Sequence, residues 1–531
     1  MKKTLTSCFI LFTTLYLNAQ TALSWQKTYG GSGHEYAWKT IPTSDGGYAF
    51  VGFSESNDGD LSGHHGTSTT NDLWVAKINA AGTIQWSKLF GGSEDEEGYD
   101  IFQTADNGFM VAGWASSSDG DVTGLHGTAG TDDFWVLKIN SAGTLVWNKC
   151  FGGTSDDNAS AIVQTQTGDF FVGGSTYSSD GDVSGNHSTS NSDFWVIKMN
   201  SSGTLLSQKC VGGTDYDEGI NMILTSDNGC AIVGRTSSAD GDAVGYHGGA
   251  DMLIAKLNSS LVVEWSKCYG GTETEECNAI VQLTDGSFAA LGYSSTQNNG
   301  DVTGHHGSQG SDDFWLLKLT STGVISWAKC YGGDGDDQAD GLTKTSDGGF
   351  VMCGLTNSTN GDVSGFHSGG FFDPDIWVAK VNSTGVFQWQ RCIGGSGQDE
   401  AFNVYEEGTG TYVITGFTYS NNYDVTLNHG SADGWILKVT GANGVDELNQ
   451  QNYFSTSPNP FHEELTLKIL TSNSKIEKIL IYNLLGKQMK VLENKNFVDG
   501  YKIETTDLPK GIYFMEIYGN TIRKIEKVIK E

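Results

Sequence analysis

The stretch Trp86-Ser-Lys-Leu-Phe-Gly-Gly92 decides the fold, because variants of it recur along most of the chain. The residue that opens each unit recurs at spacings of 61, 61, 60, 58, 62 and 62 residues. Self-similarity at a fixed period is typical of propellers and solenoids. The unit starts are Trp25, Trp86, Trp147, Ser207, Trp265, Trp327 and Trp389.

Each unit contains four apolar segments separated by turn residues. In the second unit the Trp segment is followed by 99–104, 109–114 and 134–139, and Asn107-Gly108 stands between two of them. Asn-Gly and Asp-Gly steps favour hairpins, because Gly accepts a positive φ and Asn or Asp tolerates it. The run 109–114 is apolar at consecutive positions, which is typical of a strand buried on both faces. Each unit is therefore predicted to be a four-stranded meander.

The composition, with 72 Gly and 5 Pro among 531 residues, favours an all-β fold. We expect residues 20–441 to form a seven-bladed β-propeller with about 60 residues per blade. The first Trp strand, 23–28, has no preceding partner, and the last unit ends at 434–439 without a following Trp strand. Pairing these two segments closes the last blade. A β-solenoid, or a ring with another number of blades, is the alternative.

The N-terminus has the three regions of a secretory signal peptide. Lys2 and Lys3 precede an apolar run from Cys8 to Leu17, and cleavage is predicted between Ala19 and Gln20. The apolar run is too short to span a bilayer, and no other segment of the chain approaches that length. Residues 1–19 are therefore expected to be removed, leaving an exported chain with no transmembrane segment.

The formal net charge of −32 is unevenly distributed. Residues 1–20 and 448–531 each carry +2, so residues 21–447 carry −36. Such a region repels nucleic acid and anionic lipid and attracts cations or basic partners. Eight cysteines follow the signal peptide, and five of them occupy the same position of successive units. Equivalent positions on different blades are too far apart to pair, so no disulfide framework is expected.

The repeat ends near residue 441, and the composition then becomes rich in Lys and Ile. Residues 442–452 are predicted to be a linker. Alternation of apolar and polar residues in 465–469, 479–482 and 512–517 predicts a small antiparallel β-sandwich over 453–531.

This C-terminal segment resembles the type A sorting domain of type IX secretion substrates. The resemblance implies passage through the outer-membrane translocon of that system, followed by attachment to the cell surface or release. An accessory sandwich without a sorting role is the alternative. The repeats are similar to Gly- and Asp-rich propeller repeats of bacterial surface proteins, for which no residue-level chemistry is known. The sorting-signal residues are Pro458, Asn459, Pro460, Gly486, Gly511, Tyr513 and Lys527.

A loop with an Asp-Gly-Asp step followed by a His recurs in the first four units. In the last three units Asn replaces the first Asp, and the second Asp and the His remain. Carboxylates two residues apart can converge on a hard cation such as Ca²⁺. The alternative is that Asp accepts backbone N–H groups while His packs against a neighbouring blade. Zinc or copper at the His is a weaker alternative. The metal candidates are Asp58, Asp60, Asp119, Asp121, Asp180, Asp182, Asp240 and Asp242.

An active site needs unlike residues used once, whereas the prominent residues here recur in most units. The acidic residues after each Gly-Gly are interpreted as a solvated rim. His34, Arg235 and Arg391 break the symmetry, but the sequence places no nucleophile or base beside them, and no catalytic residue is assigned. We expect a binding or adhesion module for an unidentified glycan, protein or cation. A glycan-active lyase or hydrolase and a structural spacer are the alternatives.

Overall fold

The computed structural model describes residues 22–308, 310–367, 373–441, 454–458, 460–469, 476–483, 487–493, 497–498, 500–519 and 523–531. The predicted signal peptide 1–19, with its cleavage point between Ala19 and Gln20, and the predicted linker 442–452 lie outside these residues. The chain divides into two compact units, Met1–Asn443 and Gly444–Glu531.

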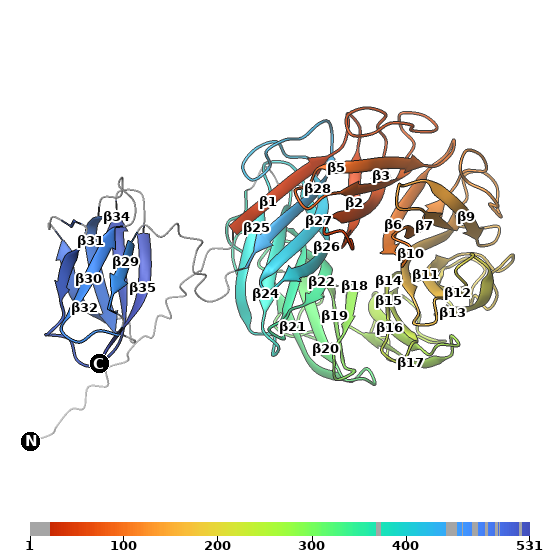
Figure 1. The fold of residues 1–531 in the computed structure, drawn as a ribbon. Helices are drawn as coiled ribbons and strands as arrows, with labels where there is room; N and C mark the ends of the chain where they lie inside the picture. Colours follow the sequence, from red (N-terminus) through yellow and green to blue (C-terminus); the bar gives the residue numbers. More distant parts are fainter. Residues whose placement is uncertain are drawn as a thin grey trace, which may run out of the picture. The chain divides into compact units, whose positions relative to one another are not determined.

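The first unit consists of seven antiparallel four-stranded sheets arranged radially, with the first strand of each sheet innermost (Figure 1). The innermost strands are β2 (Glu35–Pro42), β6 (Glu96–Gln103), β10 (Asp157–Gln164), β14 (Asp217–Leu224), β18 (Glu275–Gln282), β22 (Asp337–Lys344) and β26 (Asp399–Gly408). The second strands are β3 (Tyr48–Ser54), β7 (Phe109–Ala115), β11 (Phe170–Thr176), β15 (Cys230–Thr236), β19 (Phe288–Ser294), β23 (Phe350–Thr356) and β27 (Thr411–Thr418).

The third strands are β4 (Asp72–Ile78), β8 (Asp133–Ile139), β12 (Asp193–Met199), β16 (Asp251–Leu257), β20 (Asp313–Leu319), β24 (Asp375–Val381) and β28 (Asp433–Thr440). The outer strands are β5 (Ile84–Phe90), β9 (Leu145–Phe151), β13 (Leu205–Val211), β17 (Val263–Tyr269), β21 (Ile325–Tyr331), β25 (Phe387–Ile393) and, from the N-terminus, β1 (Ala22–Tyr29). Each sheet has the four-stranded antiparallel meander of a β-propeller blade, as the sequence predicts.

The second and third strands of each sheet form the core. All seven residues of β3 and all seven of β4 are buried, because neighbouring sheets cover both faces. Val51 and Val75 of one sheet pack in a cluster with Val111 and Leu137 of the next. Full burial of one such side chain stabilises the fold by about 1.5–3 kcal/mol. The contact between sheets therefore explains why most residues of these strands are apolar on both faces.

The N-terminal strand belongs to the sheet of the last repeat. β1 pairs antiparallel with β28, with Gln26 opposite Leu437. The Tyr29 hydroxyl donates a 2.8 Å hydrogen bond to the carbonyl of Gly82, in the sheet of the first repeat. The innermost strand of that sheet, β2, also contacts β26 of the last repeat.

Short turns join the first strand of a sheet to the second and the third to the fourth, whereas the long loop joins the second to the third. A buried Lys anchors the short turns. Lys77 Nζ donates to Asp45 Oδ1 at 3.0 Å and to Gln85 Oε1 at 2.9 Å. The long loops are left at the other end of each sheet, where the outer strand also passes to the next sheet.

The second unit contains two sheets, ordered β29-β30-β33 and β32-β31-β34-β35. Its core includes Phe461, Leu467, Ile481 and Met515. Its strands are β29 (Phe454–Ser457), β30 (Glu464–Ile469), β31 (Ile476–Asn483), β32 (Gln488–Glu493), β33 (Tyr501–Glu504), β34 (Gly511–Gly519) and β35 (Arg523–Lys530).

Candidate functional site

The first Asp of each Asp-Gly-Asp loop holds the Gly-Gly turn of its own repeat. One carboxylate oxygen accepts the backbone N–H of the residue after the second Gly, which fixes the turn. These four aspartates therefore have a local structural role. The bonds, each 2.8 Å long, run to Asp58 from Ser32, to Asp119 from Ser93, to Asp180 from Thr154 and to Asp240 from Thr214.

The His of each loop contacts the Asp that heads the third strand of its own repeat, and His65, His126 and His247 also approach an Asp of the next repeat. His126 Nδ1 lies 2.7 Å from Asp133 Oδ2 at the start of its own third strand. Its Nε2 lies 3.6 Å from Asp182 Oδ2, the second loop Asp of the next repeat. The Nδ1 contact, 2.6–2.9 Å long, recurs in all seven repeats: His65–Asp72, His126–Asp133, His187–Asp193, His247–Asp251, His306–Asp313, His367–Asp375 and His429–Asp433.

The remaining predicted metal ligands also have separate partners. Asp121 Oδ2 lies 3.9 Å from His65 Nε2. The Gly30 N–H lies 3.3 Å from Asp60 Oδ2, and the Gly212 N–H lies 3.4 Å from Asp242 Oδ2. Within the described part of the chain, no group of three or more His, Cys, Asp or Glu side chains surrounds a common point where a metal ion would fit.

One carboxyl of each acidic cluster after Gly-Gly is buried, so the interpretation of these clusters as a solvated rim is wrong for that residue. Asp157 is 0 % exposed and accepts N–H or O–H bonds from Gly153 and Ser178, both at 2.8 Å. Burial raises its pKa to about 6. The equivalent residues, all 0 % exposed, are Glu35, Glu96, Asp157, Asp217, Glu275, Asp337 and Asp399.

The cysteines are buried and unpaired in the described residues: Cys150, Cys210, Cys230, Cys268, Cys277, Cys330, Cys353 and Cys392. Burial raises the pKa of the Cys210 thiol to about 12, so the reactive thiolate is scarce at neutral pH. These residues act as small apolar side chains of the sheets.

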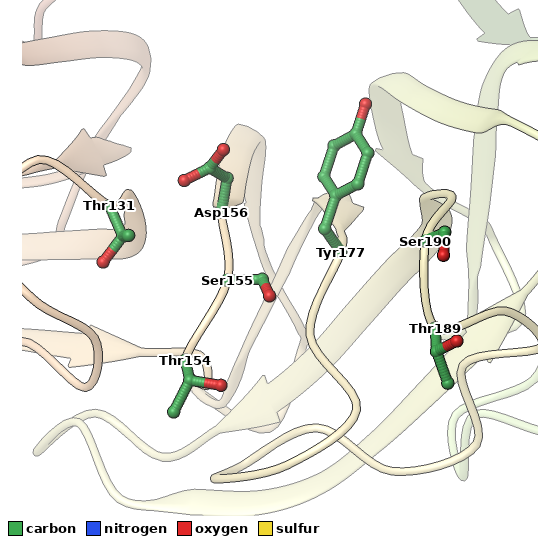
Figure 2. Close-up of a pocket in the computed structure, with 7 residues that line it drawn as sticks. All are labelled: Thr131, Thr154, Ser155, Asp156, Tyr177, Thr189 and Ser190. Atoms are coloured by element: carbon green, nitrogen blue, oxygen red, sulfur yellow. The ribbon is translucent and has the colours of Figure 1, made fainter.

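A polar pocket opens among the loops of the second and third repeats. Its volume is about 340 Å³, and its walls are Thr131, Thr154, Ser155, Asp156, Tyr177, Thr189 and Ser190. Figure 2 shows Asp156 and Tyr177 standing on adjacent loop segments, whose backbones are joined by a 2.9 Å bond from Tyr177 N–H to Asp156 C=O. Ser237 occupies the place of Tyr177 in the next repeat. Tyr419 occupies the same place in the last repeat, so a tyrosine stands there in two of the seven repeats.

A second departure from symmetry lies on the innermost strands. Tyr36 and Trp38 of β2, Tyr99 of β6 and Phe402 of β26 form one aromatic cluster. The ring centroids of Trp38 and Phe402 are 4.2 Å apart, and those of Trp38 and Tyr99 are 5.0 Å apart. All four side chains are partly exposed, and the buried Trp38 Nε1 has no hydrogen-bond partner.

Two carboxyls, Asp340 of β22 and Glu400 of β26, accompany this aromatic cluster on the innermost strands. Asp340 Oδ1 accepts a 3.0 Å bond from Asn278 Nδ2, whereas Asp340 Oδ2 is buried without a partner. Desolvation, and then the charge of Glu400, raise the pKa of Asp340 well above its usual range. Desolvation also raises the pKa of Glu400 to about 7. Phe402 and Asn278 occupy the place of Asp340 in neighbouring repeats, so this acidic pair occurs once.

The three residues that break the repeat symmetry, His34, Arg235 and Arg391, each have a hydrogen-bond or ion-pair partner. His34 Nδ1 lies 3.1 Å from the Tyr419 hydroxyl. Arg235 forms ion pairs with Glu218 at 2.6 Å and Glu276 at 3.3 Å. Arg391 lies 3.2 Å from Asp424.

The sorting-signal residues are spread over the second unit. Pro458 and Pro460 lie between β29 and β30, and Gly511 and Tyr513 lie in β34. The Tyr513 hydroxyl donates a 2.6 Å bond to the carbonyl of Pro509. Lys527 of β35 stands opposite Phe514. Asn459 and Gly486 lie outside the described residues.

Residues 456–531 match the family of secretion system C-terminal sorting domains. This match confirms the resemblance stated from the sequence. The protein is therefore a β-propeller protein with a type IX sorting domain, exported to the cell surface or released. None of the described residues forms a helix with the length and hydropathy needed to cross a bilayer.

Known proteins are similar to this chain at low sequence identity. The regulatory protein FlaEY of Caulobacter vibrioides is 22% identical over 423 residues, which cover 71% of this chain and 42% of that protein. This chain thus spans less than half the length of that relative. The WD40 domain of Neurospora crassa Pan2 has a TM-score of 0.41 at 8% identity, covering 79% of this chain and 99% of that one. A puromycin hydrolase also has a TM-score of 0.41, at 9% identity, covering 82% of this chain and 59% of that one.

Proposed function

We propose that this protein is an exported binding or adhesion module, a closed ring of seven blades that presents its long loops to a ligand outside the cell. The pairing of β1 with β28 and the contact between β26 and β2 support closure of the ring. The sorting domain supports recognition by the type IX outer-membrane translocon during export.

The loop pocket around Tyr177 is the observation that carries this proposal. Five of its seven wall residues bear Ser or Thr hydroxyls, and Tyr177 and Asp156 add an aromatic ring and a carboxylate. Hydroxyls and carboxylates bond to sugar hydroxyls, and an aromatic face packs on the apolar face of a sugar ring. The pocket therefore fits a short glycan segment.

A glycan array probed with the full exported chain tests this proposal. Wild type is expected to retain at least one glycan, and Tyr177→Ala to weaken that binding at least tenfold. Ser237→Ala, at the equivalent place of the next repeat, is the matched control and is expected to bind like wild type. Binding that survives Tyr177→Ala would place the ligand elsewhere, and no binding to any glycan would oppose the proposal.

A glycan-active enzyme is the second candidate, favoured by the single pair Asp340 and Glu400 beside the aromatic cluster. Two carboxyls with raised pKa values supply a proton donor and an acceptor near neutral pH. Degradation of a polysaccharide panel by the full chain tests this candidate. Glu400→Gln is expected to abolish turnover, whereas Glu218→Gln is not. The absence of turnover on the whole panel would argue against it.

A further inference from the structure

Two buried carboxyls meet wherever one sheet passes to the next, and we call each such place a junction. One carboxyl heads the third strand of a sheet, and the other heads the first strand of the following sheet. All fourteen residues are 0 % exposed. The pairs are Asp72–Glu96, Asp133–Asp157, Asp193–Asp217, Asp251–Glu275, Asp313–Asp337, Asp375–Asp399 and Asp433–Glu35.

A glycine brings the two carboxyls of each junction together. A methyl group at Gly152 would lie 2.5 Å from Asp157 Oδ2 and 2.7 Å from Asp133 Oδ1. The two oxygens are therefore no farther apart than the sum of these distances. A single ion with oxygen ligands at 2.3–2.6 Å can bridge such a gap. The equivalent glycines, each close to two carboxylate oxygens, are Gly30, Gly91, Gly152, Gly212, Gly270, Gly332 and Gly394.

One oxygen of each junction has no partner. Asp133 Oδ2 accepts the backbone N–H of His126 and lies 2.7 Å from its ring, but Asp133 Oδ1 is buried and bonds to nothing. The same oxygen is unpartnered in all seven repeats, at Asp72, Asp133, Asp193, Asp251, Asp313, Asp375 and Asp433. At one junction His64 Nε2 lies 3.9 Å from this oxygen, which is beyond hydrogen-bond distance.

Hydrogen-bond donors hold the second carboxyl of the junction. The other carboxyl, Asp157, receives bonds from Gly153 N–H and Ser178 Oγ and also from the Thr176 hydroxyl. Donors of this kind stabilise a carboxylate rather than a carboxylic acid. Buried charges are normally paired or coordinate metals. A repeated unpartnered oxygen beside a second carboxylate is therefore a place where a positive ligand would be stabilised.

We propose that each of the seven junctions binds one hard cation, such as Ca²⁺, between the two buried carboxylates. Oxygen donors suit Ca²⁺, and water or backbone oxygens supply its remaining ligands. The Asp-Gly-Asp loops are the calcium candidates that the sequence offers, whereas this site uses the Asp that heads the third strand.

The amount of Ca²⁺ bound by the full exported chain tests this proposal. The chain is stripped with chelator at pH 7.5, dialysed against Ca²⁺ and analysed by elemental mass spectrometry. About seven Ca²⁺ per chain are expected, with one fewer in Asp133→Asn and again in Asp193→Asn. Asp119→Asn, in a loop of the same repeat, is the control and is expected to keep the wild-type number.

Circular dichroism shows whether each variant is folded, and a variant that fails this check is replaced by its equivalent in another repeat. A wild-type chain that binds no Ca²⁺, Na⁺ or Mg²⁺ would overturn the proposal and leave a proton or water at the junction. A Ca²⁺ number that falls in Asp119→Asn but not in Asp133→Asn would overturn it as well, by returning calcium to the loops.

Discussion

Among single residues, the glycine at each junction allows the carboxyls of neighbouring sheets to approach each other closely. Gly152 lies between two carboxylate oxygens, and any side chain there would separate them. Its φ lies outside the left-handed region, so space rather than backbone freedom explains its presence. A substitution at Gly152 therefore tests the packing of the junction alone.

We expect Gly152→Ala to lower the free energy of unfolding by about 2 kcal/mol, because the added methyl group displaces Asp157 or Asp133. Thermal or denaturant unfolding of the full chain measures this change. Gly408→Ala is the matched control, since no atom lies within 4 Å of its added methyl group and its φ is also not left-handed. Equal free energies of unfolding for the two variants would show that the junction accommodates the added methyl group without displacing a carboxyl.

Among the strands, we expect removal of the N-terminal strand β1 to lower the melting temperature most. β1 supplies the outer strand of the last sheet, and its Trp25 and Tyr29 pack with Phe50 and Trp74 of the first repeat. Without β1, the edge of β28 would be open and this cluster incomplete.

A chain that begins at residue 30 is therefore expected to unfold on the order of 5–10 °C below a chain that begins at residue 20. It is also expected to associate through the open edge of β28, which size-exclusion chromatography would detect. Equal melting temperatures and a monomeric elution volume for both chains would contradict the role given to β1.

The sequence predicted the strands of each repeat and the pairing of the chain ends, but it did not predict the buried carboxyls of the junctions. The Trp period and the Asn-Gly and Asp-Gly turns predicted four strands per unit and the pairing of the chain ends. The buried acids were missed, because Glu96 stands within the acidic run Glu94-Asp-Glu-Glu97 and its partner Asp72 belongs to the preceding repeat. An Asp directly before the third apolar strand of every repeat was the available signal. The pair Asp340 and Glu400 could not be predicted either, because it depends on β22 and β26 lying side by side.

At the scale of the whole molecule, charge governs stability. Residues 21–447 carry a formal charge of −36, and fourteen of their carboxyls are buried at the junctions. Burial raises the pKa of Asp157 and Asp217 to about 6 and that of Asp337 and Asp399 to about 7, from an ordinary 3.8. The folded protein therefore binds protons more tightly than the unfolded chain.

In chelator, we expect the protein to melt at a higher temperature at pH 5 than at pH 8. Stability gained from a raised pKa is complete below the unfolded value and is lost as pH rises through the folded value, here between about 4 and 7. Carboxylates with a lowered pKa, such as Asp227 at about 2, stay charged throughout this range. Melting curves at both pH values test this expectation, and Asp337→Asn should reduce the difference. A higher melting temperature at pH 8 would contradict the sign.

Thermal unfolding of the full chain at pH 7.5, in chelator and then in millimolar Ca²⁺, shows whether the repeated acids bind cations at the junctions. A cation that binds only the folded state raises the midpoint by mass action. We expect a clear rise of the midpoint for wild type, the same rise for Asp119→Asn and a smaller one for Asp133→Asn. No rise for wild type, or a rise lost only in Asp119→Asn, would contradict cation binding at the junctions.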